Sequence, residues 1–401
     1  MNVILFDTSA IRQQFLPLTF TRPVCELRVG IQTITEKWAD YFHSKPSFLT
    51  ENYLTVKYPQ KPAGYNWYIN GAICPNDALV SQIKALEPEE CLRSGDVLVA
   101  VRTIAVLNLD FQATNFKLKE TEVSFTILQQ ITDIFSKNAA QIEADFARIT
   151  EGRTSQPITD RFTAFYNESQ IFIEEGADIK AASLNAEKGA IYIGRNAVIQ
   201  EGSHIQGPFA LCEGSTINLG GKMRPNTTIG PHCKVGGEVS NVVFIGNSNK
   251  GHDGFLGNAV LGEWCNLGAA TNNSNLKNDY GKVDLYNYVT EKFESTGLQF
   301  CGLIMGDHSK TAIGTLFNTG TVVGVNCNIF VSGLTPRHIP SFTWGGGDDS
   351  HKYVIGKALQ VASITMDRRG KVLDEMEEGI LKAVYEITEA NPSPPQSSAN
   401  L

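Results

Sequence analysis

An aliphatic-type side chain recurs at every sixth position through one stretch of the 401-residue chain. The series is Ile193, Ile199, Ile205, Leu211, Ile217, Met223, Ile229 and Val235. A period of six fits neither an α-helix, which repeats every 3.6 residues, nor an isolated strand, which repeats every two. It fits a triangular solenoid in which each side of a coil takes six residues and the periodic side chain points into a stacked core. A β-sandwich with glycine-rich turns is the alternative, but a sandwich has no reason to keep one phase for so long.

Glycines lie between the periodic positions, as in Gly207-Pro208, Gly220-Gly221 and Gly230-Pro231. Glycine adopts the positive φ angles that the corners of such a coil need. The sequence therefore predicts a left-handed parallel β-helix of the hexapeptide-repeat type. Since each coil contacts only its neighbours, insertions are expected at corners, where chemistry is best sought.

The residues before the solenoid alternate between strand-like and helix-like segments, which predicts an α/β domain of truncated Rossmann-like type. Two helix-like segments follow the solenoid. The expected organisation is an α/β domain over 1–150, a linker over 151–168, the β-helix over 169–347, C-terminal helices over 348–390 and a disordered tail over 391–401. One helix is also expected from Phe125 to Phe146.

Composition excludes several classes of protein. The net charge is −8 and no basic block stands out, which argues against a nucleic-acid partner. Eight scattered cysteines form no CxxC pair, so buried thiols in a reducing cytosol are expected rather than zinc or disulfides. The first residues do not resemble a signal peptide, and no apolar run is long enough to span a membrane. We therefore expect a cytoplasmic protein without a membrane partner.

The six-residue phase fails between Gly246 and Gly281, where histidine, lysine and asparagine accumulate. His252 lies on a glycine corner and is either a general base or a surface histidine without a role. A second polar corner contains Asp307, His308 and Ser309. A nucleophilic triad is not favoured there, because adjacent residues of a strand point in opposite directions. The histidines also lack the spacing of a known metal site.

The segment Lys250-Gly-His-Asp-Gly-Phe-Leu-Gly-Asn-Ala-Val-Leu-Gly-Glu-Trp-Cys-Asn-Leu-Gly-Ala-Ala-Thr271 carries a family resemblance. It is similar to the acetyltransferase domain of GlmU, the bifunctional N-acetylglucosamine-1-phosphate uridyltransferase and glucosamine-1-phosphate acetyltransferase. The whole chain resembles the GlmU-like sugar nucleotidyltransferases of Bacteroidetes-type bacteria. Two positions depart from the GlmU pattern: Phe255 replaces a tyrosine, and Ser240 replaces a phosphate-binding lysine.

The resemblance implies a role for each matching residue of the solenoid. His252 would be the general base for attack of a sugar amine on acetyl-CoA, and Asn275 would orient that amine or a water. Substrate contacts are implied for Arg224, Lys250, Asn266 and Lys282, with Arg224 on the sugar phosphate. Acetyl-CoA is expected along the later coils, at Gly306, Asp307, His308 and Ser309. The resemblance also implies a homotrimer.

The segment Leu16-Pro-Leu-Thr-Phe-Thr-Arg-Pro23 resembles the one after the phosphate loop of sugar nucleotidyltransferases, but the preceding residues contain no glycine. Ligands of open α/β sheets bind at the carboxyl ends of strands. The residues expected to bind nucleotide and sugar phosphate are Arg12, Arg22, Arg28, Asn70 and Gly71. Asp77 is a candidate Mg²⁺ ligand or, with Asn76, a helix N-cap.

The leading hypothesis is a bifunctional enzyme that makes UDP-N-acetylglucosamine from glucosamine-1-phosphate, acetyl-CoA and UTP, with Mg²⁺ in the nucleotidyl transfer. One alternative keeps only the acetyltransferase and makes the N-terminal domain a degenerate binding module. Another is nucleotidyl transfer from dTTP. The last is a non-catalytic sensor of nucleotide sugars.

Overall fold

The computed structural model describes residues 1–347 and 349–390, and the tail expected over 391–401 lies outside them. The chain forms two compact units. The first contains residues 1–27, 32–131 and 375–380, and the second contains the rest of the described chain. The compact units divide at 131/132, and residues 28–31 belong to the second unit.

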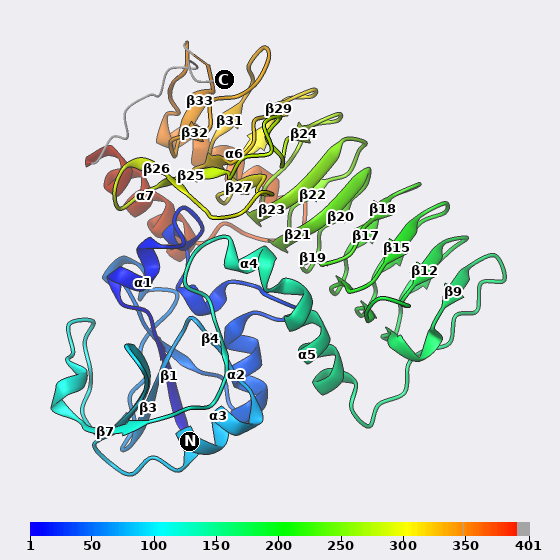
Figure 1. Cartoon of the computed structure of the whole chain (residues 1–401). Helices are drawn as coiled ribbons and strands as arrows, with labels where there is room; N and C mark the ends of the chain where they lie inside the picture. The colour runs from blue at the N-terminus through cyan, green and yellow to red at the C-terminus, as the bar shows by residue number, and fades with distance from the viewer. Residues whose placement is uncertain (348, 391–401) are drawn as a thin grey trace. The chain divides into compact units, whose positions relative to one another are not determined.

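The first unit is built on a six-stranded sheet in the order β2-β1-β3-β6-β5-β7, in which β1 pairs in parallel with both β2 and β3 (Figure 1). The apolar run Val3–Phe6 is buried, which explains why β1 occupies an inner position. The elements are β1 (Asn2–Phe6), α1 (Ser9–Gln13), α2 (Ile34–Phe42), β2 (Ser47–Leu49), β3 (Asn66–Asn70), β4 (Ile73–Cys74), α3 (Asp77–Lys84), β5 (Glu90–Ser94), β6 (Val97–Thr103), β7 (Lys117–Glu120) and β8 (Thr126–Ile127).

The second unit is a parallel β-solenoid of the left-handed β-helix type, whose coils stack from β9 to β33 (Figure 1). All eight side chains of the six-residue series are buried in its core, which confirms the reading of the repeat. Its strands up to the long β21 are β9 (Ala164–Tyr166), β10 (Ile171–Ile173), β11 (Asp178–Ile179), β12 (Ser183–Asn185), β13 (Ile191–Ile193), β14 (Val198–Ile199), β15 (His204–Gln206), β16 (Phe209–Leu211), β17 (Thr216–Ile217), β18 (Lys222–Met223), β19 (Thr227–Ile229), β20 (Lys234–Val235) and β21 (Glu238–Gly246).

The later coils carry an insertion, an antiparallel hairpin of β25 and β26, which lies just after the stretch from Gly246 to Gly281 where the six-residue phase fails. The strands are β22 (Asn249–Lys250), β23 (Phe255–Glu263), β24 (Asn272–Asn273), β25 (Asp284–Asn287), β26 (Lys292–Ser295), β27 (Leu303–Met305), β28 (Lys310–Thr311), β29 (Leu316–Phe317), β30 (Thr321–Val323), β31 (Asn328–Ile329), β32 (His338–Ile339), β33 (Thr343–Gly345) and β34 (His351–Lys352). The glycine-rich segment after Pro340 continues the solenoid, because β33 pairs in parallel with β31.

Four helices accompany the solenoid sequence: α4 (Asp133–Ser136), α5 (Asn138–Thr150), α6 (Ile355–Asp367) and α7 (Glu375–Ala390). The single helix expected from Phe125 to Phe146 is wrong, since that stretch contains β8, α4 and most of α5. Ile142 and Phe146 of α5 are buried against Phe172 and Ala210 of the solenoid. This apolar packing explains why the helix belongs to the second unit rather than to a linker.

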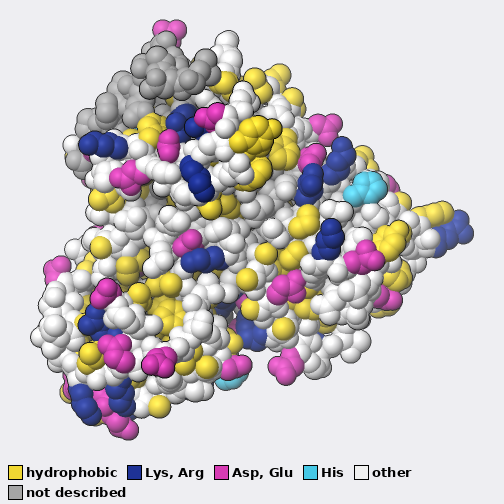
Figure 2. Space-filling view, viewed as in Figure 1, with side chains coloured by type: hydrophobic (Ala, Val, Ile, Leu, Met, Phe, Trp, Pro, Cys, Tyr) yellow, Lys and Arg dark blue, Asp and Glu magenta, His cyan; other side chains and the backbone are white. Residues whose placement is uncertain are grey.

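All eight cysteines are buried and free, as their scattered spacing predicts. No helix within residues 1–347 and 349–390 combines the length and the apolar character needed to cross a bilayer. Basic and acidic side chains are interspersed over the face of the molecule drawn in Figure 2.

Candidate functional site

His252 is exposed on the corner that joins β22 to β23. Three hydrogen bonds fix the backbone of this corner, and none of them uses the imidazole. Lys250 Nζ donates to the His252 carbonyl at 2.7 Å, Asn218 Nδ2 donates to the Gly251 carbonyl at 2.7 Å, and the Ala270 amide donates to the Asp253 carbonyl at 3.0 Å. The corner therefore presents a solvent-accessible imidazole on a backbone whose position is held, as a general base requires.

Glycine at position 254 is required by this corner. Its φ is +125°, and a Cβ placed there would lie 2.1 Å from the carbonyl oxygen of Thr271 in the next coil. Any side chain at 254 would push the two coils apart or turn the corner. The glycine pattern around His252 therefore follows from coil stacking as well as from access to the imidazole.

Arg224 lies on the side of the solenoid that begins at this corner. Glu238 pairs in register with Phe255, and the Arg224 amide donates to the Val239 carbonyl, so the three coils stack on one face. The exposed guanidinium of Arg224 contacts Glu238, with 3.1 Å between Nη1 and Oε1. The register thus gives this face a cation that a sugar phosphate can reach, with a carboxylate that orients it.

Asn275 follows β24 and is half-buried, with its Nδ2 donating to Asn258 Oδ1 at 2.8 Å. Its neighbours close the same side of the solenoid with side-chain amides. Asn272 Oδ1 accepts from the Phe255 amide at 2.7 Å, and Asn273 Oδ1 accepts from the Gly257 amide at 2.7 Å. Asn275 is therefore held at the end of the side that starts near His252.

Lys250 is buried, although the resemblance implies that it contacts substrate. It pairs with Val235, which belongs to the inward-facing series, so its side chain enters the core. Its ammonium donates to the carbonyls of Gly236 and His252. Burial lowers the pKa of Lys250 to about 8, and Asp253 acts in the opposite direction. This placement favours a role in holding the His252 corner over a direct contact with substrate.

The two other residues with implied substrate contacts lie in different surroundings. Lys282 is exposed at the base of the inserted hairpin and donates to the Gly297 carbonyl. Asn266 is half-buried, and its Oδ1 lies 3.4 Å from Asn249 Nδ2. Asn266 and Asn249 line a cavity beside α6 rather than the face that carries Arg224.

The segment expected to contact acetyl-CoA is buried. Ser309 Oγ donates to the Gly324 carbonyl and accepts from the Cys327 amide, so it links coils. Asp307 Oδ1 accepts from the Glu263 amide, and His308 stacks against Trp264 with a φ of 60°. A Cβ on Gly306 would approach the backbone of Gly324 to 2.8 Å. These residues form a buried solenoid corner. The next residue, Lys310, is half-buried and is the first after this segment that is not fully buried.

In the first unit, Arg12 is buried, and its guanidinium is used by the chain itself. It donates to the carbonyls of Thr19 and Arg22, to Thr50 Oγ1 and to the Tyr53 hydroxyl. It also lies 3.4 Å from Asp7 Oδ2. The glycine-free segment after β1 is the short helix α1, so Arg12 organises this end of the sheet where a glycine-rich loop would otherwise hold phosphates.

Asp7 is a residue that the sequence analysis did not single out. It is buried at the carboxyl end of β1, and burial raises its pKa to about 6 although Arg12 acts to lower it. The Val24 amide donates to Oδ2, while Oδ1 is buried without a hydrogen-bond partner among the described residues. A charged residue directly after a buried strand was the signal in the sequence.

Arg22 is buried in the first unit. Arg28 belongs to the second unit, where Nε donates to the Ile245 carbonyl at 3.1 Å and Nη1 donates to the Ile31 carbonyl. The sequence groups these arginines with Arg12 as phosphate ligands, but the guanidinium of Arg28 binds solenoid backbone instead. Its partner is distant in sequence, so spacing gave no signal for it.

Asn70 and Gly71 form a buried turn after β3. Asn70 Nδ2 donates to the Leu98 carbonyl, and its Oδ1 accepts from the Ala72 amide. Asn76 Oδ1 accepts from the Leu79 amide and is the N-cap of α3, which leaves Asp77 exposed as the first residue of that helix. No group of three or more metal-ligating side chains occurs in the part of the chain that the structure describes. Asp77 alone therefore does not fit a magnesium site.

Comparison with known proteins gives the N-terminal residues a family. Residues 3–154 match the family model described as sugar nucleotidyl transferase. The chain is 36% identical over 124 residues to the bifunctional protein GlmU of Methanocaldococcus jannaschii, covering 30% of each chain. It is 30% identical over 154 residues to a bifunctional sugar-1-phosphate nucleotidylyltransferase/acetyltransferase of Sulfurisphaera tokodaii, covering 38% of each.

A third relative is an uncharacterized acetyltransferase, YaiX, of Escherichia coli O6:K15:H31. The identity is 26% over 163 residues, which cover 40% of this chain and 70% of the relative. The matches to the two bifunctional relatives span about a third of their length. Residues 3–154 thus match a sugar nucleotidyl transferase domain, and the described chain continues as a β-solenoid. Over about a third of its length the chain is similar to proteins named as bifunctional sugar nucleotidyltransferase/acetyltransferases.

Proposed function

We propose that the solenoid transfers an acetyl group from acetyl-CoA to the amine of an amino-sugar 1-phosphate, with glucosamine-1-phosphate as the substrate. The observation that carries this proposal is the His252 corner, where an exposed imidazole lies on a backbone fixed by Lys250, Asn218 and Ala270. The relatives named as acetyltransferases support the same chemistry.

His252 takes the proton from the attacking amine while the amine nitrogen bonds to the thioester carbonyl carbon. The carbon–sulfur bond then breaks, and the proton passes to the departing thiolate, which leaves as free coenzyme A. Arg224 binds the sugar phosphate, and Glu238 keeps its guanidinium on that face of the solenoid. Asn275 orients the amine. Lys250 positions His252 through the carbonyl of that residue and is not itself a substrate ligand.

The N-terminal domain is proposed to transfer a uridylyl group from UTP to the acetylated sugar phosphate, which gives UDP-N-acetylglucosamine. The match of residues 3–154 to sugar nucleotidyl transferases supports this reaction. Asp77 belongs to no group of three or more metal-ligating side chains among the described residues, and Asp7 Oδ2 contacts Arg12, so neither carboxylate by itself forms a Mg²⁺ site. A homotrimer in the cytoplasm is proposed from the resemblance alone.

A second candidate is an acetyltransferase whose N-terminal domain has lost nucleotidyl transfer. The hydrogen bonds of Arg12 favour it, because the cation closest to the missing glycine-rich loop is committed to the carbonyls of Thr19 and Arg22. The same domain could then still bind a nucleotide sugar without turning it over.

A coupled assay separates these candidates. Purified protein is given glucosamine-1-phosphate and acetyl-CoA, and thiol release is followed for the wild type, His252→Ala and His204→Ala. His204 is also an exposed solenoid histidine and serves as the matched control. UTP and magnesium are then added, and pyrophosphate is measured.

Thiol release should fall about 100-fold or more in His252→Ala, the range of general-base contributions, and stay unchanged in His204→Ala. Pyrophosphate in the second stage supports the bifunctional enzyme, whereas thiol without pyrophosphate supports the second candidate. Absence of thiol release with every amino-sugar phosphate would reject acetyl transfer.

A further inference from the structure

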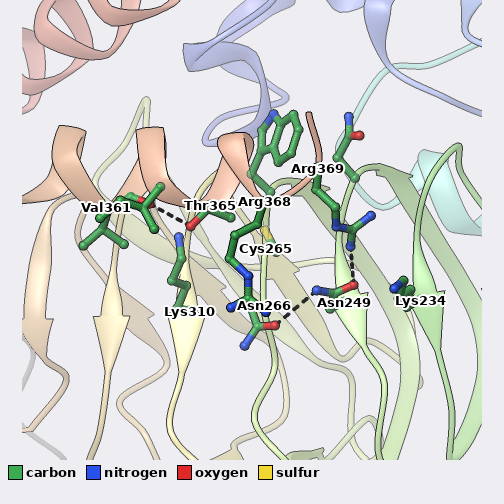
Figure 3. A pocket seen from close by; sticks show the side chains of 12 residues that line it. Lys234, Asn249, Cys265, Asn266, Lys310, Val361, Thr365, Arg368 and Arg369 are labelled. Atoms are coloured by element: carbon green, nitrogen blue, oxygen red, sulfur yellow. Dashed lines mark hydrogen bonds between the residues drawn. The ribbon is translucent and has the colours of Figure 1, made fainter. Parts of the chain in front are cut away.

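A cavity of about 430 Å³ lies in the second unit, between α6 and the solenoid strands β20, β22 and β28. Figure 3 shows Arg368 and Arg369 extending from the end of the helix toward the strands, and Lys310 pointing from its strand toward the helix. Lys234 completes the basic lining. This volume suits a small molecule rather than a single inorganic ion.

The charge of the cavity has one sign. Four of its twelve lining residues are lysine or arginine, and none of the twelve is acidic. The nearest carboxylate that hydrogen-bonds to the lining is Glu263, which accepts from Asn247 Nδ2 at 3.2 Å. Four cations around one small space repel each other unless an anion occupies it, so the lining favours a ligand with more than one negative charge.

Two of these cations are pre-organised. Arg369 donates to the His232 carbonyl and to Asn249 Oδ1, both at 2.7 Å, which fixes its guanidinium at the cavity wall. Lys310 Nζ donates to the His308 carbonyl at 2.9 Å, and burial lowers the pKa of Lys310 to about 8. An anion beside Lys310 would replace the solvation that its ammonium has lost.

The other lining residues favour an organic anion over inorganic phosphate as the ligand. Trp264 contributes an aromatic surface, and the amides of Asn247, Asn249 and Asn266 supply donors and acceptors for polar atoms of a ligand. Arginine forks match phosphoryl oxygens in two-point contacts. The space is enclosed by a helix on one side, so an extended polyanion such as a nucleic acid does not fit as well as a small molecule.

We propose that this cavity is a binding site for the diphosphate group of a nucleotide ligand, held by Lys234, Lys310, Arg368 and Arg369. The site is distinct from the face that carries Arg224 and His252. Coenzyme A and nucleotide sugars share this chemistry, so either can be its source. If coenzyme A is the source, the site rests on the proposed acetyl transfer and holds its co-substrate, whereas a nucleotide sugar would bind here independently of that reaction.

The test is titration calorimetry on the full chain with coenzyme A, UDP-N-acetylglucosamine, inorganic diphosphate and, as an uncharged control, adenosine. The variants are Arg368→Glu and Lys310→Gln, with Lys188→Glu as the matched control. Lys188 is an exposed solenoid lysine outside the cavity, and Arg368 is exposed, so neither charge reversal disturbs the core.

At least one of the two nucleotides should bind. Arg368→Glu should raise its dissociation constant tenfold or more, and Lys310→Gln should raise it severalfold, while Lys188→Glu leaves it unchanged. Adenosine should not bind. The nucleotide whose affinity the two cavity variants reduce identifies the source of the diphosphate.

Unchanged affinity for every diphosphate ligand in both cavity variants overturns the site, as does the absence of binding by all three. The thiol-release assay on the wild type keeps the two hypotheses apart. Normal diphosphate binding by a wild-type protein that releases no thiol with any amino-sugar phosphate supports the cavity while rejecting the proposed function. Thiol release without an effect of the cavity variants on diphosphate binding rejects the cavity alone.

Discussion

Arg12 of the N-terminal unit and the exposed arginines Arg224 and Arg368 of the solenoid unit are used in opposite ways. Arg12 is buried and donates to two backbone carbonyls, a threonine hydroxyl and a tyrosine hydroxyl, so its charge stabilises the chain. Arg224 and Arg368 are exposed on the solenoid, where a ligand can reach them. A buried arginine whose donors are all used within the chain is therefore weak evidence of binding, whereas an arginine with a donor exposed to a cavity or to solvent can still hold a ligand.

The largest effect should come from removing the committed cation. Arg12→Met leaves the Asp7 carboxylate and several buried acceptors without their donor, which should lower the free energy of unfolding of this unit by about 3–5 kcal/mol. Arg224→Met, the exposed counterpart, should change it by less than about 0.5 kcal/mol. Denaturant titration of both variants measures the contrast. Equal stability of the two would show that the hydrogen bonds of Arg12 contribute little.

Asp7 should make the N-terminal unit more stable in mild acid. Its pKa in the folded state, about 6, lies above the ordinary value of 3.8 for an aspartate, so the folded state binds the proton more tightly. The free energy of unfolding should therefore fall by on the order of 3 kcal/mol as pH rises from about 4 to 6, and it should stay low above pH 6. Chemical denaturation between pH 4.5 and 7.5 measures this slope.

Asp7→Asn is the control for that slope, because the amide has nearly the same shape and does not titrate. The wild type should lose stability relative to the variant as the pH increases through 6. Parallel curves for the two proteins would mean that another group carries the dependence.

The sequence predicted the fold of the solenoid better than it predicted the solenoid's catalytic and substrate-binding residues, and Lys250 shows why. Core positions Ile199, Ile217 and Val235 are 18 residues apart, but the next residue in register, Lys250, follows after only 15. The shortened coil hides a core position from any search for a fixed period. Lys250 therefore reads as a polar residue beside His252, although its side chain enters the core.

The residues before the solenoid were harder to interpret for a different reason. Strand β1 and the N-cap at Asn76 follow from local sequence, because a buried apolar run and a capping side chain act within a few residues. The bond from Arg28 to Ile245 joins residues more than 200 positions apart, and the packing of α5 depends on side chains of other coils. The spacing of residues along the sequence does not indicate such long-range contacts.

Lys250→Met tests whether the buried lysine positions His252. The folded pKa of Lys250 is lowered to about 8 from 10.5, so the unfolded state binds more protons between these values. The free energy of unfolding of the wild type should therefore increase by on the order of 1–2 kcal/mol as pH rises from 8 to 10.5. The increase is small because hydrogen bonds to two carbonyls offset part of the cost of burying the ammonium. The variant should lack this rise.

The same variant should reduce kcat for acetyl transfer about tenfold while leaving KM for the sugar phosphate unchanged, since the corner loses its anchor but the binding face does not. A purely structural lysine would alter the pH dependence of stability without this selective loss of kcat.

The smallest effect belongs to the exposed cation that we assign to substrate. Arg224→Gln should raise KM for glucosamine-1-phosphate about tenfold with little change in kcat, because its contact with the phosphate is present in both ground state and transition state. Stability should be unaffected, as expected for an exposed ion pair. Glu238→Gln should raise KM only about twofold, because the guanidinium stays and loses only its orientation. A loss of kcat in Arg224→Gln would instead put the guanidinium next to the reacting amine and bring the phosphate-binding role back into question.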